Sequence, residues 1–138
     1  MEYIKQKEKT KIIIYKNDKI LVLEKNAPKK RYVLPGGFLK KKEEPVICLL
    51  REVMEETNVL LNTKHIKVID TINAINHQNK LLKKHYYNYK CTDEDFLNIE
   101  IEKFKAIKWV SYKSAARYTN ESDTIVIQHF FSKKNSDK

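Results

Sequence analysis

The chain has 138 residues, enough for one compact domain with a hydrophobic core. Apolar residues make up 41% and charged residues 33%, which excludes wholesale disorder. Lys and Arg number 28 and Asp and Glu 18, so the formal net charge of +10 favours anionic partners such as nucleotides, nucleic acids or acidic lipids. We expect a single domain with its core over residues 10–131 and a frayed tail over 132–138.

The sequence gives no sign of membrane insertion or export. The longest apolar run, from Val46 to Leu50, is five residues, whereas a membrane-spanning helix needs ~20. The first ten residues lack the apolar segment of a secretion signal. Cys48 and Cys91 are far apart and lack metal-ligand spacing, so we interpret them as buried thiols. We expect a cytoplasmic protein that does not bind membranes.

The N-terminal third is predicted to form strands. Two apolar runs between Lys11 and Lys25 surround Asn17-Asp18, a pattern typical of a hairpin. A third short strand, from Tyr32 to Leu34, ends at Pro35, because proline cannot continue a central strand.

Glycine is rare in this chain. Average usage would give about ten, yet there are only two, Gly36 and Gly37, directly after Pro35. We infer that the backbone geometry there requires glycine, so this bend is the first place to look for a site.

Residues 45–57 are predicted to form a helix, with Pro45 in its first turn and Asn58 as a left-handed cap. On a helical wheel the acidic residues share one side, with Arg51 on another arc. The opposite side, which we expect to pack, carries Val46, Ile47, Leu50, Val53, Met54 and Thr57. Further along, strands are expected over 66–74, 86–91 and 104–110. Helices are expected over 112–118, capped by Ser111, and 123–131, capped by Ser122. Strands on both sides of helices predict a mixed α/β sheet with helices packed on it.

Three acidic side chains, Glu52, Glu55 and Glu56, occupy positions i, i+3 and i+4 of the predicted helix. Their carboxylates share one face and repel one another unless a cation neutralises them. Oxygen ligands favour Mg²⁺ or Mn²⁺ over zinc. The alternative is a solvent-exposed acidic face balanced by lysines, and the spacing alone does not decide between them.

The segment from Gly37 to Val59 resembles the Nudix box, G-x5-E-x7-R-E-U-x-E-E-x-G-U, where U is aliphatic. Eight of the nine specified positions match; Asn58 replaces a glycine, and Asn tolerates a positive φ. A second departure is Lys42, where many members have glycine. The resemblance extends to the strand that ends in Pro-Gly-Gly and to the later Trp109-Val110-Ser111, and so covers residues 10–131.

The resemblance implies an α/β/α sandwich and hydrolysis of a nucleoside diphosphate linked to another group X. It assigns Glu52, Glu55 and Glu56 as metal ligands, joined by the backbone carbonyl of Gly36 or Gly37. It pairs Arg51 with Glu43 in a structural role. The general base is left open, the candidates being Glu94, Glu100 and Glu102.

Substrate contacts are less defined. Thr119-Asn120-Glu121 resembles a segment of the MutT branch in which Asn reads the purine base, although an Asn that starts the last helix by an Asx turn is the alternative. Lys29 and Arg31 are candidates for attracting a polyphosphate, and the alternative is that they are solvent-exposed charges without a role in binding.

We therefore predict a Mg²⁺-dependent, MutT-like hydrolase that converts nucleoside triphosphates to monophosphates and pyrophosphate. Alternative substrates are ADP-ribose, dinucleoside polyphosphates and 5′-triphosphate RNA. A different class, a basic RNA- or nucleotide-binding module without catalysis, also fits the charge.

Overall fold

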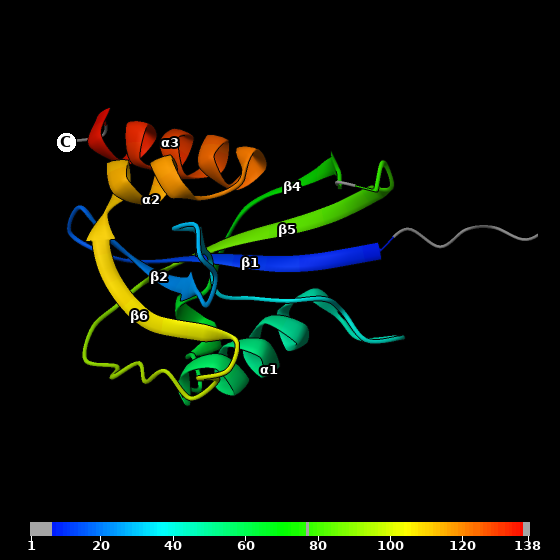
Figure 1. Cartoon of the computed structure of the whole chain (residues 1–138), viewed down its shortest axis with the longest axis horizontal. Coiled ribbons are helices and arrows are strands. Elements are labelled where there is room, and N and C mark those ends of the chain that lie inside the picture. Colours follow the sequence, from blue (N-terminus) through cyan, green and yellow to red (C-terminus); the bar gives the residue numbers. More distant parts are fainter. Residues whose placement is uncertain (1–6, 77, 137–138) are drawn as a thin grey trace, which may run out of the picture.

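The computed structural model describes residues 7–76 and 78–136, and its strands form one mixed sheet (Figure 1). The strands are β1 (Lys7–Lys16), β2 (Lys19–Lys25), β3 (Tyr32–Val33), β4 (Lys67–Ile75), β5 (Leu81–Lys90) and β6 (Phe104–Ser111). The sheet order is β3-β2-β1-β5-β4, and β6 pairs with β2. Only the β1–β5 pair is parallel among the described pairs of strands. The predicted mixed sheet and the N-terminal hairpin are confirmed.

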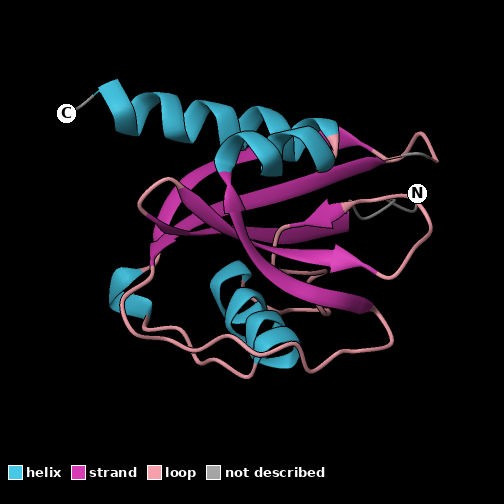
Figure 2. Cartoon of the chain, turned by 60° about the vertical axis from the view of Figure 1, so that its left-hand side comes forward, coloured by secondary structure: helices cyan, strands magenta, loops and turns pink. Residues whose placement is uncertain are grey.

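Helices cover both faces of this sheet (Figures 1 and 2). They are α1 (Pro45–Thr57), α2 (Tyr112–Tyr118) and α3 (Glu121–Ser136), with a short 3-10 turn at Thr63–His65 that the sequence did not predict. Both views place α1 on one face and α2 with α3 on the other, which confirms the α/β/α sandwich. Within the described residues, none of the helices combines the length and the hydrophobicity needed to cross a bilayer.

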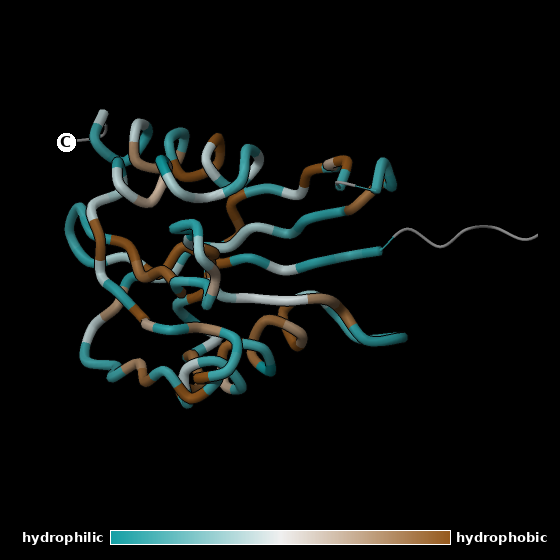
Figure 3. The backbone as a smooth tube through the Cα atoms, viewed as in Figure 1, coloured by the Kyte–Doolittle hydropathy of each residue, from teal (hydrophilic) through white to brown (hydrophobic). Residues whose placement is uncertain are grey.

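The two faces of β1 supply two hydrophobic clusters. Ile12 and Ile14 share a buried cluster with Leu49 of α1. Ile13, between them in sequence, belongs to the cluster that contains Phe131 of α3. The alternation of a strand sends successive side chains to opposite faces. The central segments are accordingly the hydrophobic ones in Figure 3.

Both predicted ends of α1 are confirmed. Pro45 occupies the first turn, and Asn58 has φ of 62° with its N–H donating to Met54 O (2.9 Å). The predicted packing face is wrong in part, because Ile47 is 51% exposed whereas Glu56 is only 2% exposed. Burial of Glu56 is possible because a backbone N–H of the glycine bend hydrogen-bonds its carboxylate.

The last helix differs from its prediction at both ends. Asp123 N donates to Asn120 Oδ1 (2.9 Å), so Asn120 caps α3 in place of Ser122. The residues expected to fray are helical through Ser136, and 137–138 lie outside the described residues. This end is held because Lys134 Nζ lies 5.4 Å from the centre of the Tyr15 ring, and because basic side chains favour a helix C-terminus.

The remaining elements lie close to their predicted positions. Ser111 caps α2 by accepting from Ser114 N (3.1 Å), as predicted. Strands β1 and β5 begin earlier than expected, at Lys7 and Leu81, because polar residues continue their ladder. The thiols of Cys48 and Cys91 are buried, as predicted.

Candidate active site

The Pro35-Gly36-Gly37 bend is fixed to β1 by backbone hydrogen bonds. Thr10 N donates to Gly37 O (2.8 Å) and Ile12 N donates to Pro35 O (3.0 Å). Gly36 has φ of 136°, and a Cβ added there would lie 2.1 Å from Thr10 O. Any other residue would collide with the backbone of β1 and adopt a strained conformation, so the bend requires glycine at this position.

The second glycine makes room for a carboxylate. A Cβ on Gly37 would lie 2.3 Å from Cδ of Glu52 and 2.5 Å from its Oε2. The Glu52 side chain is 15% exposed, so its carboxylate lies directly against the bend. Helix α1 thus meets the bend where the sequence predicted a site.

Glu56 reaches the same bend from the next turn of α1. Its Oε1 accepts a hydrogen bond from Gly36 N (3.0 Å). Burial raises the pKa of Glu56 to about 8, and the charges of Glu52 and Glu100 add to the rise, although Gly36 N–H and the Lys11 ammonium oppose it. A buried carboxylate beside two others favours a neutralising cation or a proton.

Arg51 ties the loop before α1 to the helix. Its Nε donates to Glu43 Oε2 (2.9 Å) and its Nη2 to Glu43 Oε1 (2.8 Å), which confirms the predicted pairing. A further bond runs from Nη2 to Phe38 O (3.2 Å). The hydrogen bonds from Arg51 hold the pKa of Glu43 down at about 2. Such two-pronged pairing fixes geometry as well as charge.

The same guanidinium also contacts the acidic cluster. Arg51 Nη1 donates to Glu52 Oε1 (2.9 Å) and to Glu55 Oε1 (3.2 Å). Arg51 was predicted on another arc of the helix, but its long side chain extends to both of these acids. Arg51 neutralises part of the cluster in this arrangement.

The donor set at the bend suits a hard divalent cation. Carboxylate and carbonyl oxygens are the ligands that Mg²⁺ prefers. Across residues 7–76 and 78–136, no group of three or more His, Cys, Asp or Glu side chains is already gathered as a metal site, and Arg51 holds two of the acids instead. The Gly37 carbonyl accepts from Thr10 and from Cys48 Sγ (3.4 Å), so Gly36 remains as the carbonyl candidate.

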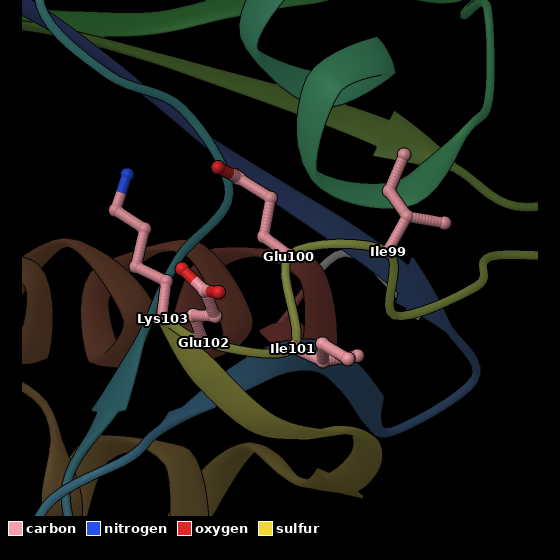
Figure 4. A pocket seen from close by; sticks show the side chains of 5 residues that line it. All are labelled: Ile99, Glu100, Ile101, Glu102 and Lys103. Carbon is pink, nitrogen blue, oxygen red and sulfur yellow. The ribbon is translucent and has the colours of Figure 1, made fainter.

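Glu100 is the later carboxylate that the fold brings to this cluster. Its loop is tied to the end of α1, because Leu97 N donates to Thr57 O (3.0 Å). The charge of Glu100 contributes to the raised pKa of Glu56. Residues 99–103 line a cavity of about 570 Å³, and Figure 4 shows Glu100 and Lys103 extending to the same side of the loop while Ile101 points away.

The other two candidates for the general base are placed differently. Burial favours a high pKa for Glu94, but hydrogen bonds from Tyr89 and Thr92 outweigh it and lower the pKa to about 2. Glu102 is exposed. Of these three candidates, Glu100 is therefore the one whose charge acts on an acid of α1, which the sequence did not indicate.

The predicted substrate residues do not converge on the acids. Asn120 Oδ1 is used as the cap of α3, which is the Asx-turn alternative, and its amide nitrogen is not needed for that role. Lys29 and Arg31 are exposed in the β2–β3 connection. No hydrogen bond or ion pair of the described residues joins either side chain to the acidic cluster. Lys42 has φ of 64°, which explains why glycine suits this position.

Comparisons with known proteins agree with this geometry. The fold is shared with the MutT NUDIX hydrolase from Burkholderia pseudomallei (TM-score 0.77, 15% identity, 91% of this chain and 98% of that chain). It is also shared with a C. elegans Ap4A hydrolase (TM-score 0.74, 16% identity, 94% of this chain and 98% of that chain). A third protein with this fold is the E. coli dihydroneopterin triphosphate pyrophosphohydrolase (TM-score 0.73, 18% identity, 89% of this chain and 93% of that chain). No curated protein matches the chain by sequence.

A family match covers most of the chain. The NUDIX domain matches residues 6–130, a span that holds the glycine bend, the acids of α1 and Glu100. The chain therefore belongs to the Nudix family and is a pyrophosphohydrolase of phosphorus-containing anhydrides.

Proposed function

We propose that the protein is a Mg²⁺-dependent, MutT-like nucleoside triphosphate pyrophosphohydrolase that releases a nucleoside monophosphate and pyrophosphate. The observation that carries this proposal is the placement of the Glu52 and Glu56 carboxylates against the glycine bend. The similarity of the fold to that of a MutT NUDIX hydrolase supports the choice of substrate class.

Glu52, Glu55 and Glu56 would hold the metal together with the Gly36 carbonyl. A bound divalent cation, Mg²⁺ or Mn²⁺, supplies charge neutralisation at the phosphate oxygens and lowers the pKa of the attacking water. If Glu52 and Glu55 held a cation, Arg51 would keep its two bonds to Glu43, because these bonds do not involve the other acids. Glu43 and Arg51 thus keep the loop in place during the reaction.

Glu100 is proposed as the general base. Its carboxylate accepts a proton from water as the water oxygen bonds to phosphorus, and the anhydride P–O bond breaks to release the leaving phosphate oxygen. The nearby Glu56 is itself buried and carries a raised pKa, so a second, more accessible carboxylate suits proton transfer better.

The test is turnover of a nucleotide panel with Mg²⁺, scored by products. We expect nucleoside monophosphate and pyrophosphate from wild type, and loss of product with EDTA and in Glu52→Gln. Glu102→Gln, on the same loop as Glu100 but exposed, is the matched control and should retain activity, whereas Glu100→Gln should lose most of it. Wild-type protein that binds nucleotides without forming products would refute hydrolysis and support the binding module.

Dinucleoside polyphosphates form the second candidate class, because a C. elegans Ap4A hydrolase shares the fold over 94% of this chain. Inclusion of such a substrate in the panel separates the two: a preference for it over triphosphates would overturn the first choice while leaving the acidic site in place. ADP-ribose and 5′-triphosphate RNA complete the panel.

A further inference from the structure

A groove lies between the start of β1 and the segment that leads from the glycine bend to α1. Leu39 N donates to Glu8 O (3.0 Å), and Lys9 and Phe38 form an antiparallel bridge, so the two segments run side by side (Figure 1). Residues 38–45 line a cavity of about 770 Å³ there, together with Lys7 and Glu8. A volume of this size has room for a small organic ligand.

The groove is cationic. The basic residues that line it are Lys7, Lys40, Lys41 and Lys42. All four are exposed, and none of them forms an ion pair within residues 7–76 and 78–136. Two of the acids that line the groove have other partners, because Arg51 binds Glu43 (2.8 Å) and His85 Nε2 lies 2.8 Å from Glu8 Oε1. The lysines therefore leave an excess of positive charge in the groove.

An aromatic ring is exposed among these charges. Phe38 is 49% exposed, although most large apolar side chains of the sheet are buried. Lys9 Nζ lies 4.8 Å and Lys7 Nζ 5.8 Å from the centre of the Phe38 ring. The backbone at Phe38 is fixed, because its carbonyl accepts a hydrogen bond from Arg51 Nη2 (3.2 Å). The groove thus presents a positioned ring with ammonium groups beside it.

We propose that this groove binds single-stranded RNA. The lysines neutralise phosphates of the chain, and an unpaired base stacks on the Phe38 ring. A duplex suits the groove less well, since its bases are stacked on one another and do not reach the ring. An acidic protein segment would satisfy the lysines alone and would leave the ring exposed.

One carboxylate in the groove favours RNA over DNA. Glu44 lines the groove and has no ion pair within the described residues. An ionised carboxylate repels phosphate and only accepts hydrogen bonds. The ribose 2′-hydroxyl is a donor that DNA lacks, so it can bind Glu44. This inference goes beyond the proposed function, because it assigns a second ligand to a surface that none of Glu52, Glu55 and Glu56 lines.

The lysines are tested by fluorescence anisotropy in EDTA, with a 3′-labelled oligoadenylate of about ten nucleotides. A 5′-hydroxyl end keeps this RNA from being a substrate of the hydrolase. The groove variant combines Lys40→Gln, Lys41→Gln and Lys42→Gln. The charge-matched control combines Lys64→Gln, Lys67→Gln and Lys113→Gln, which are exposed positions outside the groove.

The groove variant should bind the RNA about tenfold more weakly or worse, and the control should bind within about threefold of wild type. A plot of log Kd against log salt concentration should become shallower by about 2 in the groove variant, since three phosphate contacts on a single strand are lost. Equal losses in the two triple variants would refute the groove and indicate attraction by the net charge of +10.

The ring is tested separately from the charges. Phe38→Leu should weaken RNA binding about fivefold or more without altering the salt dependence, because it removes a ring and no charge. Phe38→Trp should retain binding, and melting temperatures show that both variants are folded. With a duplex RNA of the same length, Phe38→Leu should bind like wild type. Unchanged single-strand binding by Phe38→Leu would refute stacking at this position.

The choice of RNA is tested with DNA of the same sequence. Wild type should bind the DNA more weakly than the RNA, and Glu44→Ala should bring the two affinities closer together. Equal affinities in wild type would refute the choice of RNA, and absence of RNA binding would overturn the whole inference. These measurements use neither Mg²⁺ nor a 5′ phosphate, so their outcome is independent of the turnover that tests the proposed function.

Discussion

Replacement of Gly36 and of Gly37 by alanine should affect the protein in different ways. At Gly36 the added Cβ meets the backbone of β1, 2.1 Å from Thr10 O and 2.7 Å from Thr10 C, at φ of 136°. At Gly37 it meets the end of a flexible side chain, 2.3 Å from Cδ of Glu52. The first substitution should therefore unfold the protein more easily, and the second should disturb the site.

The size of each effect follows from what must move. Relief of the clash at Gly36 weakens the two hydrogen bonds that fix the bend to β1, from Thr10 N and Ile12 N, at about 1 kcal/mol each. The positive φ adds about 1–2 kcal/mol for alanine. The total is about 3–4 kcal/mol, or a melting temperature lower by about 10 °C in a domain of this size.

For Gly37→Ala the Glu52 carboxylate must shift by about 1 Å, a displacement that lowers catalysis by about 100-fold. Its melting temperature should change by less than about 3 °C, since the displaced group is a side-chain end. Circular dichroism melts and a coupled pyrophosphate assay measure both variants. A Gly36→Ala protein as stable as wild type, or a fully active Gly37→Ala protein, would show that the bend does not work as described.

Three further changes test charged groups, two of them at the bend and one under α3. Glu43 has a pKa of about 2 against the ordinary 4.5, so its stabilising contribution is complete above pH 4.5 and is lost as the pH falls toward 2. Urea unfolding should show that Glu43→Gln loses less stability than wild type between these pH values. Equal losses in the two proteins would contradict a stabilising pair between Arg51 and Glu43. The pKa of Glu56 is shifted in the opposite direction, to about 8, so metal-free wild type should lose stability as the pH rises from 4.5 to 8, while Glu56→Gln should not. Calorimetry should show that Mg²⁺ binds more tightly as the pH rises over the same range. A pH-independent Mg²⁺ affinity would exclude Glu56 as a ligand. Asp123→Asn leaves Lys84 buried without its carboxylate, so chemical denaturation should report a loss of about 3–5 kcal/mol; Lys84→Met in the same background should recover part of it, and an unchanged single variant would argue against a buried ion pair.

Sequence patterns predicted the helix ends that depend on a single residue. Pro45 and Asn58 mark the ends of α1, and Ser111 marks the start of α2, because each residue satisfies a requirement of its own position. Asn120 was the harder case, since Asn and Ser both cap helices and only the hydrogen bond from Asp123 N shows which one does. Such a choice depends on packing of the whole helix.

The sequence predicted which acidic residues form the candidate site, but it did not predict the surroundings of each one. The helical spacing of Glu52 and Glu56 predicts a shared face, but the burial of Glu56 depends on the N–H of Gly36, which is distant in sequence. Glu100 could not be ranked, because its place follows from a loop held to α1 by Leu97. Long-range contacts of this kind leave no periodic signal in the sequence.

The lysines of β1 illustrate why a strand can be underestimated. A search for apolar runs begins the strand at Lys11, whereas the ladder with β5 begins at Lys7. Lys9 and Lys11 keep the period of two that Ile13 continues, so the alternation was present although the hydrophobicity was not. The buried face of β1 changes from cationic at Lys9 and Lys11 to apolar at Ile13. Such a change along one strand indicates that different parts of the protein cover the two halves of this face.

Lys11 and Glu56 interact at the glycine bend. Residues 35–39 take the place of β2 beside the first half of β1, through bonds at Ile12, Thr10 and Glu8. The charges of Lys11 and Glu56 act on each other at this turn, although the two residues lie on opposite sides of the sheet. Replacement of Gly36 should therefore disturb Glu56 in addition to lowering the stability, and a Gly36→Ala protein with the Mg²⁺ affinity of wild type would show that the bend does not position this carboxylate.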